Sequence, residues 1–233
     1  MKINRHANGA VCAALAAIAF TGVGVETASA ATVYSNTPNG VSWSPLGTPD
    51  TTSYGETFTL TQTETLNNLS FFASAGNAGN LELVVAAWNG TRAVGPAIYT
   101  SAVTAYAGGA RTIAFNNVNT ALTAGTYIAY MTIAGVSGAV SAVNIESSNT
   151  NGGLGGQFAY LNSNGVNPLT LTTAWVQAGA SLYPDLAYVA TFSTATPAVP
   201  VPGALPLLLS GLAALAAVSR TRSFRAGAAR RMF

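Results

Sequence analysis

The residues that could carry acid–base, nucleophilic or metal chemistry are few and unevenly spread along this 233-residue chain. Its one histidine, His6, and its one cysteine, Cys12, both fall in the first 30 residues. The segment 31–194 has neither, and it has no lysine. Ser–His–Asp, Cys–His and Schiff-base catalysis are therefore excluded there, together with disulfides and with zinc sites built on His or Cys. We predict no catalytic residue, no cofactor and no metal ligand.

Carboxylates are the groups that remain for catalysis. A glycosidase needs two carboxyl groups about 5 to 9.5 Å apart, one of them with a raised pKa. The carboxylates of the segment 31–194 show no local spacing that predicts such a pair. A secreted carbohydrate-active enzyme that uses acidic residues therefore stays an alternative. The six residues are Asp50, Glu56, Glu64, Glu82, Glu146 and Asp185.

The charge of the segment 31–194 limits its partners. It contains six carboxylates and only two basic residues, Arg92 and Arg111, which gives a net charge of −4. Without a basic stripe we expect no nucleic-acid partner. Calcium would suit an exported domain of this composition, but no Asp-rich loop is present to predict a site.

Three tryptophans are the candidate sugar-binding residues. Trp43, Trp88 and Trp175 could stack on the apolar face of a sugar ring, with nearby amide or carboxylate groups bonding the hydroxyls. They could equally fill the core, where each would bury a large area. The sequence leaves both possibilities open.

Residues 1–30 have the layout of a secretory signal peptide. Lys2 and Arg5 give a positively charged start, an apolar run covers 10–20, and the small residues at 28–30 offer a cleavage site. The apolar run is too short to span a bilayer comfortably. We therefore expect a cleaved signal and export of the segment 31–194.

The end of the chain combines three elements in a fixed order. Residues 195–204 form a proline-rich linker, 205–219 are apolar enough for a transmembrane helix, and 220–233 are basic. The positive-inside rule holds the basic end in the cytoplasm, which agrees with export of the segment 31–194. The basic anchor consists of Arg220, Arg222, Arg225, Arg230 and Arg231.

These three elements resemble the PEP-CTERM sorting signal of Gram-negative bacteria. The sorting motif is Val199, Pro200, Val201 and Pro202, followed by the Leu-Leu-Leu-Ser-Gly run at 207–211. Val201 stands where the family has its name-giving glutamate, which puts the particular processing enzyme in doubt more than the class. The resemblance implies an exosortase as partner, transient residence in the inner membrane, and then release to the envelope surface or the extracellular matrix. It also implies an association with exopolysaccharide.

The segment 31–194 has the pattern of an all-β domain. Short stretches of alternating or apolar residues are separated by Asn-Gly, Gly-Gly and Ala-Gly turns, and no helical stretch of ten residues interrupts them. We predict a two-sheet antiparallel sandwich of jelly-roll type. The expected strands are 57–61, 69–73, 81–88, 98–101, 111–115, 126–133, 139–146, 157–161 and 186–192.

Segments of this domain also resemble a β-sandwich module that often precedes PEP-CTERM tails and whose function is unsettled. The matching segments include 87–99, 122–127, 156–162 and 185–192. Together the patterns predict an exported, non-enzymatic envelope or matrix protein with polysaccharide as the candidate ligand. Besides the enzyme, a permanently anchored periplasmic binding protein remains an alternative.

Overall fold

Alternation of inward and outward side chains builds the strands of this domain. A computed structural model describes residues 30–150, 152–179 and 182–194; the predicted signal peptide, linker, membrane segment and basic anchor lie outside these residues. In β4 (Glu64–Ala75) buried side chains recur at every second position from Leu69 to Ala73. Two neighbouring strands of the other sheet, β3 (Ser53–Leu60) and β10 (Gly125–Thr132), are buried along almost their whole length. A strand that is covered on both faces needs this near-continuous burial.

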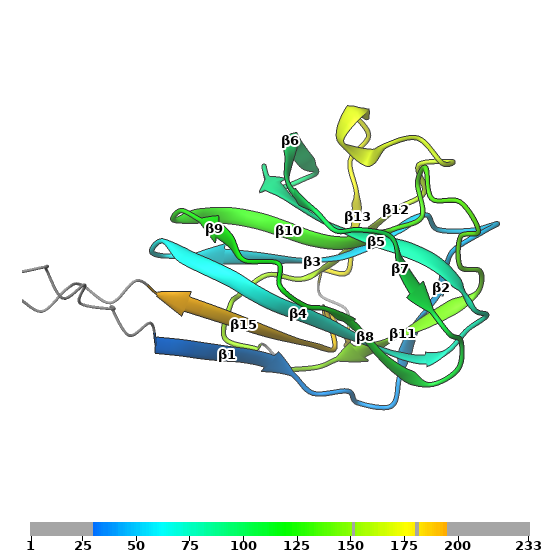
Figure 1. The fold of residues 1–233 in the computed structure, drawn as a ribbon, viewed down its shortest axis with the longest axis horizontal. Coiled ribbons are helices and arrows are strands. Elements are labelled where there is room, and N and C mark those ends of the chain that lie inside the picture. The colour runs from blue at the N-terminus through cyan, green and yellow to red at the C-terminus, as the bar shows by residue number, and fades with distance from the viewer. Residues whose placement is uncertain (1–29, 151, 180–181, 195–233) are drawn as a thin grey trace, which may run out of the picture. The chain divides into compact units, whose positions relative to one another are not determined.

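The described residues form two antiparallel sheets that pack face to face as a sandwich (Figure 1). The all-β, two-sheet prediction is therefore confirmed. The first sheet consists of β1 (Ala30–Asn36), β15 (Tyr188–Thr194), β4, β11 (Val143–Ser148), β14 (Asp185–Leu186), β2 (Ser42–Leu46), β8 (Arg111–Phe115) and β9 (Thr120–Leu122). The second consists of β13 (Val176–Gln177), β12 (Phe158–Leu161), β3, β10, β5 (Gly79–Trp88), β6 (Ala93–Thr100) and β7 (Thr104–Tyr106).

The main core lies between the two sheets. Phe58 of β3, Phe71 of β4 and Phe192 of β15 point into it, and the Phe58 and Phe192 rings meet edge to face at 6.1 Å. Phe71 and Phe192 are at most 1% exposed. Burial of such side chains from both sheets supplies the principal stabilisation of a sandwich.

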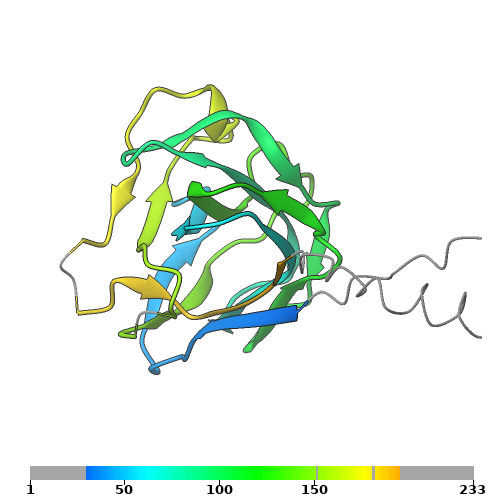
Figure 2. The same ribbon diagram turned by 90° about the vertical axis from the view of Figure 1, so that its left-hand side faces the viewer.

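A smaller apolar cluster lies on the outer face of the second sheet. Ala86, Ile128 and Ala159 of that sheet are fully buried there because the segment 163–175 crosses over them. That segment includes a short 3₁₀ turn (Pro168–Thr170), which begins at Asn167 with a side-chain cap on the Leu169 amide. Figure 2 shows this segment as the yellow layer outside the sheet.

Both ends of the described domain lie at the same end of the sandwich. β1 pairs with β15 along its whole length, with Ala30 opposite Thr194. Leu60 and Gly125 pair near this end, whereas Ser53 and Thr132 pair at the far end of the same two strands. Loops around 47–52, 133–142 and 162–167 therefore gather at the end away from the termini (Figure 1).

Candidate functional site

The loops at the far end surround an open hollow of about 470 Å³. Its walls come from three segments that are distant in sequence: Thr48–Thr52 before β3, Ile133–Ala139 after β10, and Asn162–Gly165 after β12. The antiparallel register brings these segments together, because Ser53 lies opposite both Thr132 and Leu161. No local sequence pattern could have predicted this juxtaposition.

Hydrogen bonds fix the loops around this hollow. The Thr52 hydroxyl donates to the Leu161 carbonyl at 3.1 Å and accepts from the Ser163 amide at 2.7 Å. The Thr52 carbonyl accepts from the Ile133 amide at 3.0 Å. Thr52 and Ser163 are both buried, so these bonds are shielded from water and hold the three segments together.

A second hollow, of about 270 Å³, adjoins the first along Gly135 and Gly165, which line both. It lies over the outer face of the second sheet, between that sheet and the 3₁₀ turn. Tyr130 and Thr132 are buried beneath it, and Glu82 forms part of its wall. We call the two hollows together the distal groove.

The distal groove offers oxygen and amide groups and is weakly acidic. Asp50 contributes one carboxylate and Glu82 the other, and neither arginine of the described residues belongs to its lining. Hydroxyl and amide side chains supply donors and acceptors around them, and these suit a ligand rich in hydroxyl groups. The polar residues concerned are Thr48, Thr52, Thr100, Thr132, Asn162, Asn164 and Asn167.

A second unusual feature lies inside the sandwich, where Glu56 and Asp185 form a buried acidic pair. Glu56 is 6% and Asp185 is 5% exposed, and their carboxyl groups share a hydrogen bond. The Leu186 amide donates to Glu56 Oε2 at 2.8 Å across 130 positions of sequence. Burial, followed by the charge of Asp185, raises the pKa of Glu56 well above its ordinary value. Burial also raises the pKa of Asp185.

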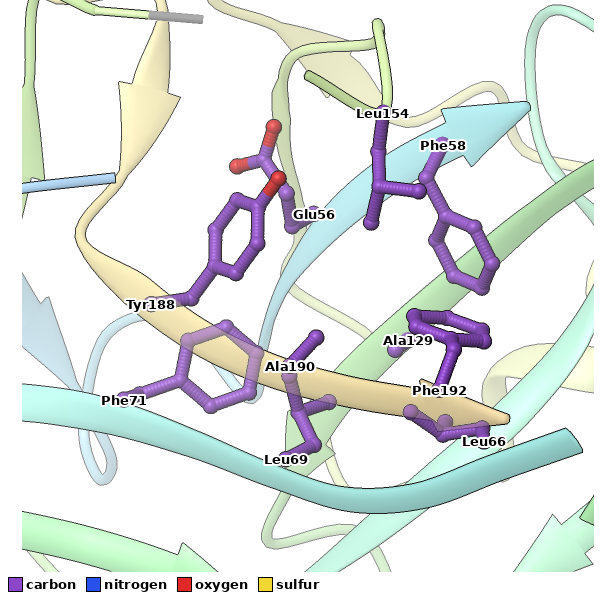
Figure 3. Close-up of a pocket in the computed structure, with 10 residues that line it drawn as sticks. All are labelled: Glu56, Phe58, Leu66, Leu69, Phe71, Ala129, Leu154, Tyr188, Ala190 and Phe192. Atoms are coloured by element: carbon purple, nitrogen blue, oxygen red, sulfur yellow. The ribbon is translucent and has the colours of Figure 1, made fainter. Parts of the chain in front are cut away.

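Glu56 of this pair lines a small apolar cavity, shown in Figure 3. Glu56 and Tyr188 place their oxygens side by side at one end, and aromatic and aliphatic side chains such as Phe58, Phe192 and Leu69 form the rest. The cavity volume is about 20 Å³, and one water needs roughly 10–15 Å³. The cavity can therefore hold a water molecule but not a sugar ring.

Two of the predicted sugar-stacking residues lie together in the outer apolar cluster. Trp88 is 8% and Trp175 is 3% exposed, and their rings meet edge to face at 6.1 Å. Trp175 also packs edge to face against Tyr130 at 5.1 Å. Trp43 lies apart from them, half-buried against Phe158 at 4.8 Å. Because both rings are buried, a sugar could stack on Trp88 or Trp175 only if the segment 163–175, which carries Trp175, moved away from the sheet.

The sorting motif Val199–Pro202 and the basic anchor Arg220–Arg231 lie outside the described residues, so they stay predictions. In the part of the chain that is described, no helix is both long and apolar enough to cross a membrane. The same residues contain no cluster of three or more His, Cys, Asp or Glu side chains placed to hold a metal. Comparison with known proteins found no matching family model, curated protein or solved structure.

Proposed function

We propose that this chain is an exported, non-enzymatic protein of the bacterial envelope or extracellular matrix, built on a sandwich of jelly-roll type. Its C-terminal segment is a PEP-CTERM-like sorting signal that holds it transiently in the inner membrane until an exosortase cuts it. The support for this part lies in the ordered Val-Pro-Val-Pro motif at 199–202, the apolar stretch at 205–219 and the five terminal arginines.

The observation that carries the proposal is the position of the distal groove relative to the chain ends. Ala30 and Thr194 pair at one end of the sandwich, so the linker that starts at residue 195 leaves from that end. The groove lies at the opposite end of the sandwich, away from the point where the predicted linker begins. A domain that presents its loops away from its attachment suits a binding role.

The chemistry of the groove favours a polysaccharide without acidic groups. Amide and hydroxyl side chains can bond sugar hydroxyls. Asp50 and Glu82 would repel uronate or sulfate groups, because no arginine of the described segments lies in the lining to compensate them. The groove residues, rather than the buried Trp88 and Trp175, are therefore the proposed contacts.

Binding to exopolysaccharide from the producing cells tests this role. Asp50→Ala and Asn162→Ala, both at exposed positions, should each weaken binding by the exported protein about tenfold, the effect of losing one or two hydrogen bonds. Thr112→Ala, on the exposed face of β8 in the other sheet, is the matched control and should bind normally. Equal binding by all variants, or no binding by the parent, would refute the groove assignment.

The enzymatic alternative has one observation to support it, the close approach of Glu56 and Asp185. Both side chains are buried, and the cavity that Glu56 lines holds no more than about one water. A glycosidase must place its two carboxyl groups on either side of a bound sugar. The buried pair is therefore a poor fit to glycoside hydrolysis, and binding is the better proposal.

A further inference from the structure

The buried acidic pair lies near another buried oxygen atom, and this atom accepts no hydrogen bond from any described residue. Asn36 is 2% exposed, and its Oδ1 atom has no hydrogen-bond partner among the described residues. Its Nδ2 group donates to the Leu186 carbonyl at 3.4 Å, while the Leu186 amide donates to Glu56 Oε2. Leu186 therefore links Asn36 to the Glu56 carboxyl group through these two hydrogen bonds. A buried acceptor without a partner is costly and calls for an explanation.

Close approach of the glycine-rich loop places these oxygens in one small region. A Cβ atom on Gly152 would stand 2.7 Å from Asn36 Oδ1 and 2.7 Å from the Tyr188 hydroxyl oxygen, so the two oxygens are near neighbours. Figure 3 shows the Tyr188 hydroxyl beside the Glu56 carboxyl group. Asn36, Glu56, Asp185 and Tyr188 therefore converge from β1, β3, β14 and β15.

The charges that act on this region from the described residues are all of one sign. The charged neighbour that acts on Glu56 is Asp185, and those that act on Tyr188 are Glu56, Asp185 and Tyr34. Arg92 is engaged elsewhere, donating to the Leu171 carbonyl at 2.9 Å. Two adjacent buried carboxyl groups without a positive partner must either share a proton or bind a cation.

A shared proton leaves the group incomplete. One proton between Glu56 and Asp185 satisfies that hydrogen bond, but it gives nothing to Asn36 Oδ1. A cation placed among the three side chains would neutralise both carboxylates and also supply the partner that Asn36 Oδ1 lacks. The unpartnered amide oxygen thus favours a cation independently of the acidic pair.

We propose that Glu56, Asp185 and Asn36 Oδ1 bind a calcium ion between the two sheets. The set contains only hard oxygen ligands, which suit Ca²⁺ and exclude a preference for soft metals. Ca²⁺ also accepts amide oxygens and irregular geometry more readily than Mg²⁺, and its remaining positions would be filled by backbone carbonyls or water. The ligands come from three separate strands, so the sequence contains no Asp-rich loop that would reveal them.

Metal content and thermal stability of the exported protein test the proposal. After treatment with a chelator and desalting, the protein should take up one Ca²⁺ per chain, measured by mass spectrometry of the eluted metal. CaCl₂ at about 100 times the dissociation constant should raise the unfolding midpoint by roughly 5–10 °C. MgCl₂ should have a smaller effect. A protein that binds no Ca²⁺ at millimolar concentration, while unfolding cooperatively, would overturn the proposal in favour of a shared proton.

Matched variants locate the ion. Asp185→Asn and Glu56→Gln keep the side-chain shape and should abolish the calcium-induced shift, whereas Asp50→Asn and Glu82→Gln in the distal groove should retain it. A shift that survives in Asp185→Asn, or is lost in Asp50→Asn, would place the ion elsewhere and refute this site.

A third variant covers the case in which neutral substitutions prevent folding. Asn36→Asp adds a carboxylate at the proposed third ligand and should give a larger calcium-induced shift than the parent. An equal or smaller shift would contradict the role of Asn36. The outcome is independent of glycan binding, since the ion lies in the interior and the groove residues keep their side chains.

Discussion

The burial of Trp88 and Trp175 decides whether these residues are interpreted as a sugar-stacking surface or as part of the core. From the sequence, Trp88 and Trp175 could have been a sugar-stacking platform or core residues, because either role uses the same ring surface. In the structure both rings are buried in the outer apolar cluster and pack against each other, with Trp175 supplied by the covering segment 163–175 itself. Nothing in their local sequence distinguishes the two roles, since the covering segment joins them only through the tertiary fold.

Truncation of Trp175 should therefore reduce stability strongly. Trp175→Ala removes a side chain that is 3% exposed and that contacts both Trp88 and Tyr130. We expect the free energy of unfolding to fall by about 3–5 kcal/mol in urea titrations. Leu182→Ala, at a side chain that is 82% exposed, should change it by less than about 0.5 kcal/mol. Similar small losses in both variants would show that the outer cluster does not stabilise the domain.

Tyr54 gives a prediction for alkaline pH. Burial, as the largest cause, raises its pKa from 10.0 to about 12. The folded state therefore binds this proton more tightly than the unfolded state, so the stabilisation is complete below pH 10 and is lost as the pH rises towards 12. Urea unfolding across this range should show stability falling less steeply for Tyr54→Phe than for the parent. Identical slopes would mean that Tyr54 does not contribute.

Among the elements, most strands of four or more residues were predictable, whereas the strands of two or three residues were not. All nine expected strands correspond to observed ones, from β3 near 57–61 to β15 near 186–192, because their alternation reflects burial on one face. The expected strand 139–146 begins instead at Val143, after an irregular stretch. Strands of two or three residues, such as β13 and β14, contain too few positions to show a period. β1 and β2 were missed as well.

The same limit applies to the candidate sites. The sequence presents Glu56 and Asp185 among six carboxylates but does not pair them, since β3 and β14 meet only when the sandwich closes. The distal groove likewise joins three loops that are separated by long stretches of chain. The sequence does contain the composition that makes both sites possible, namely glycine-rich loops and polar turns.

The glycine-rich loop can be tested as an element. A Cβ atom on Gly156 would lie 1.8 Å from the Thr57 carbonyl oxygen, and the residue has a φ of +129°. Gly156→Ala should therefore destabilise the domain by more than about 3 kcal/mol. Gly155→Ala, where the φ is +61° and an added Cβ would meet no atom within 4 Å, should cost only about 1 kcal/mol. Equal losses in urea titrations would contradict the close packing of this loop on β3.

At the scale of the whole molecule, the pairing of Ala30 with Thr194 relates the two predicted processing events to the fold. A signal peptide removed near residue 30 and a linker that starts at residue 195 would both join the sandwich at the same end. The distal groove lies at the opposite end of the sandwich from these two junctions. This arrangement links the proposed sorting signal to the proposed binding role.

The most direct measurement is the intact mass of the protein recovered from the cell surface or culture medium. We predict a species that begins near Ala31 and ends close to the Val199–Pro202 motif, without any of the five C-terminal arginines. A recovered protein that still carries Arg231 would contradict the proposed sorting signal.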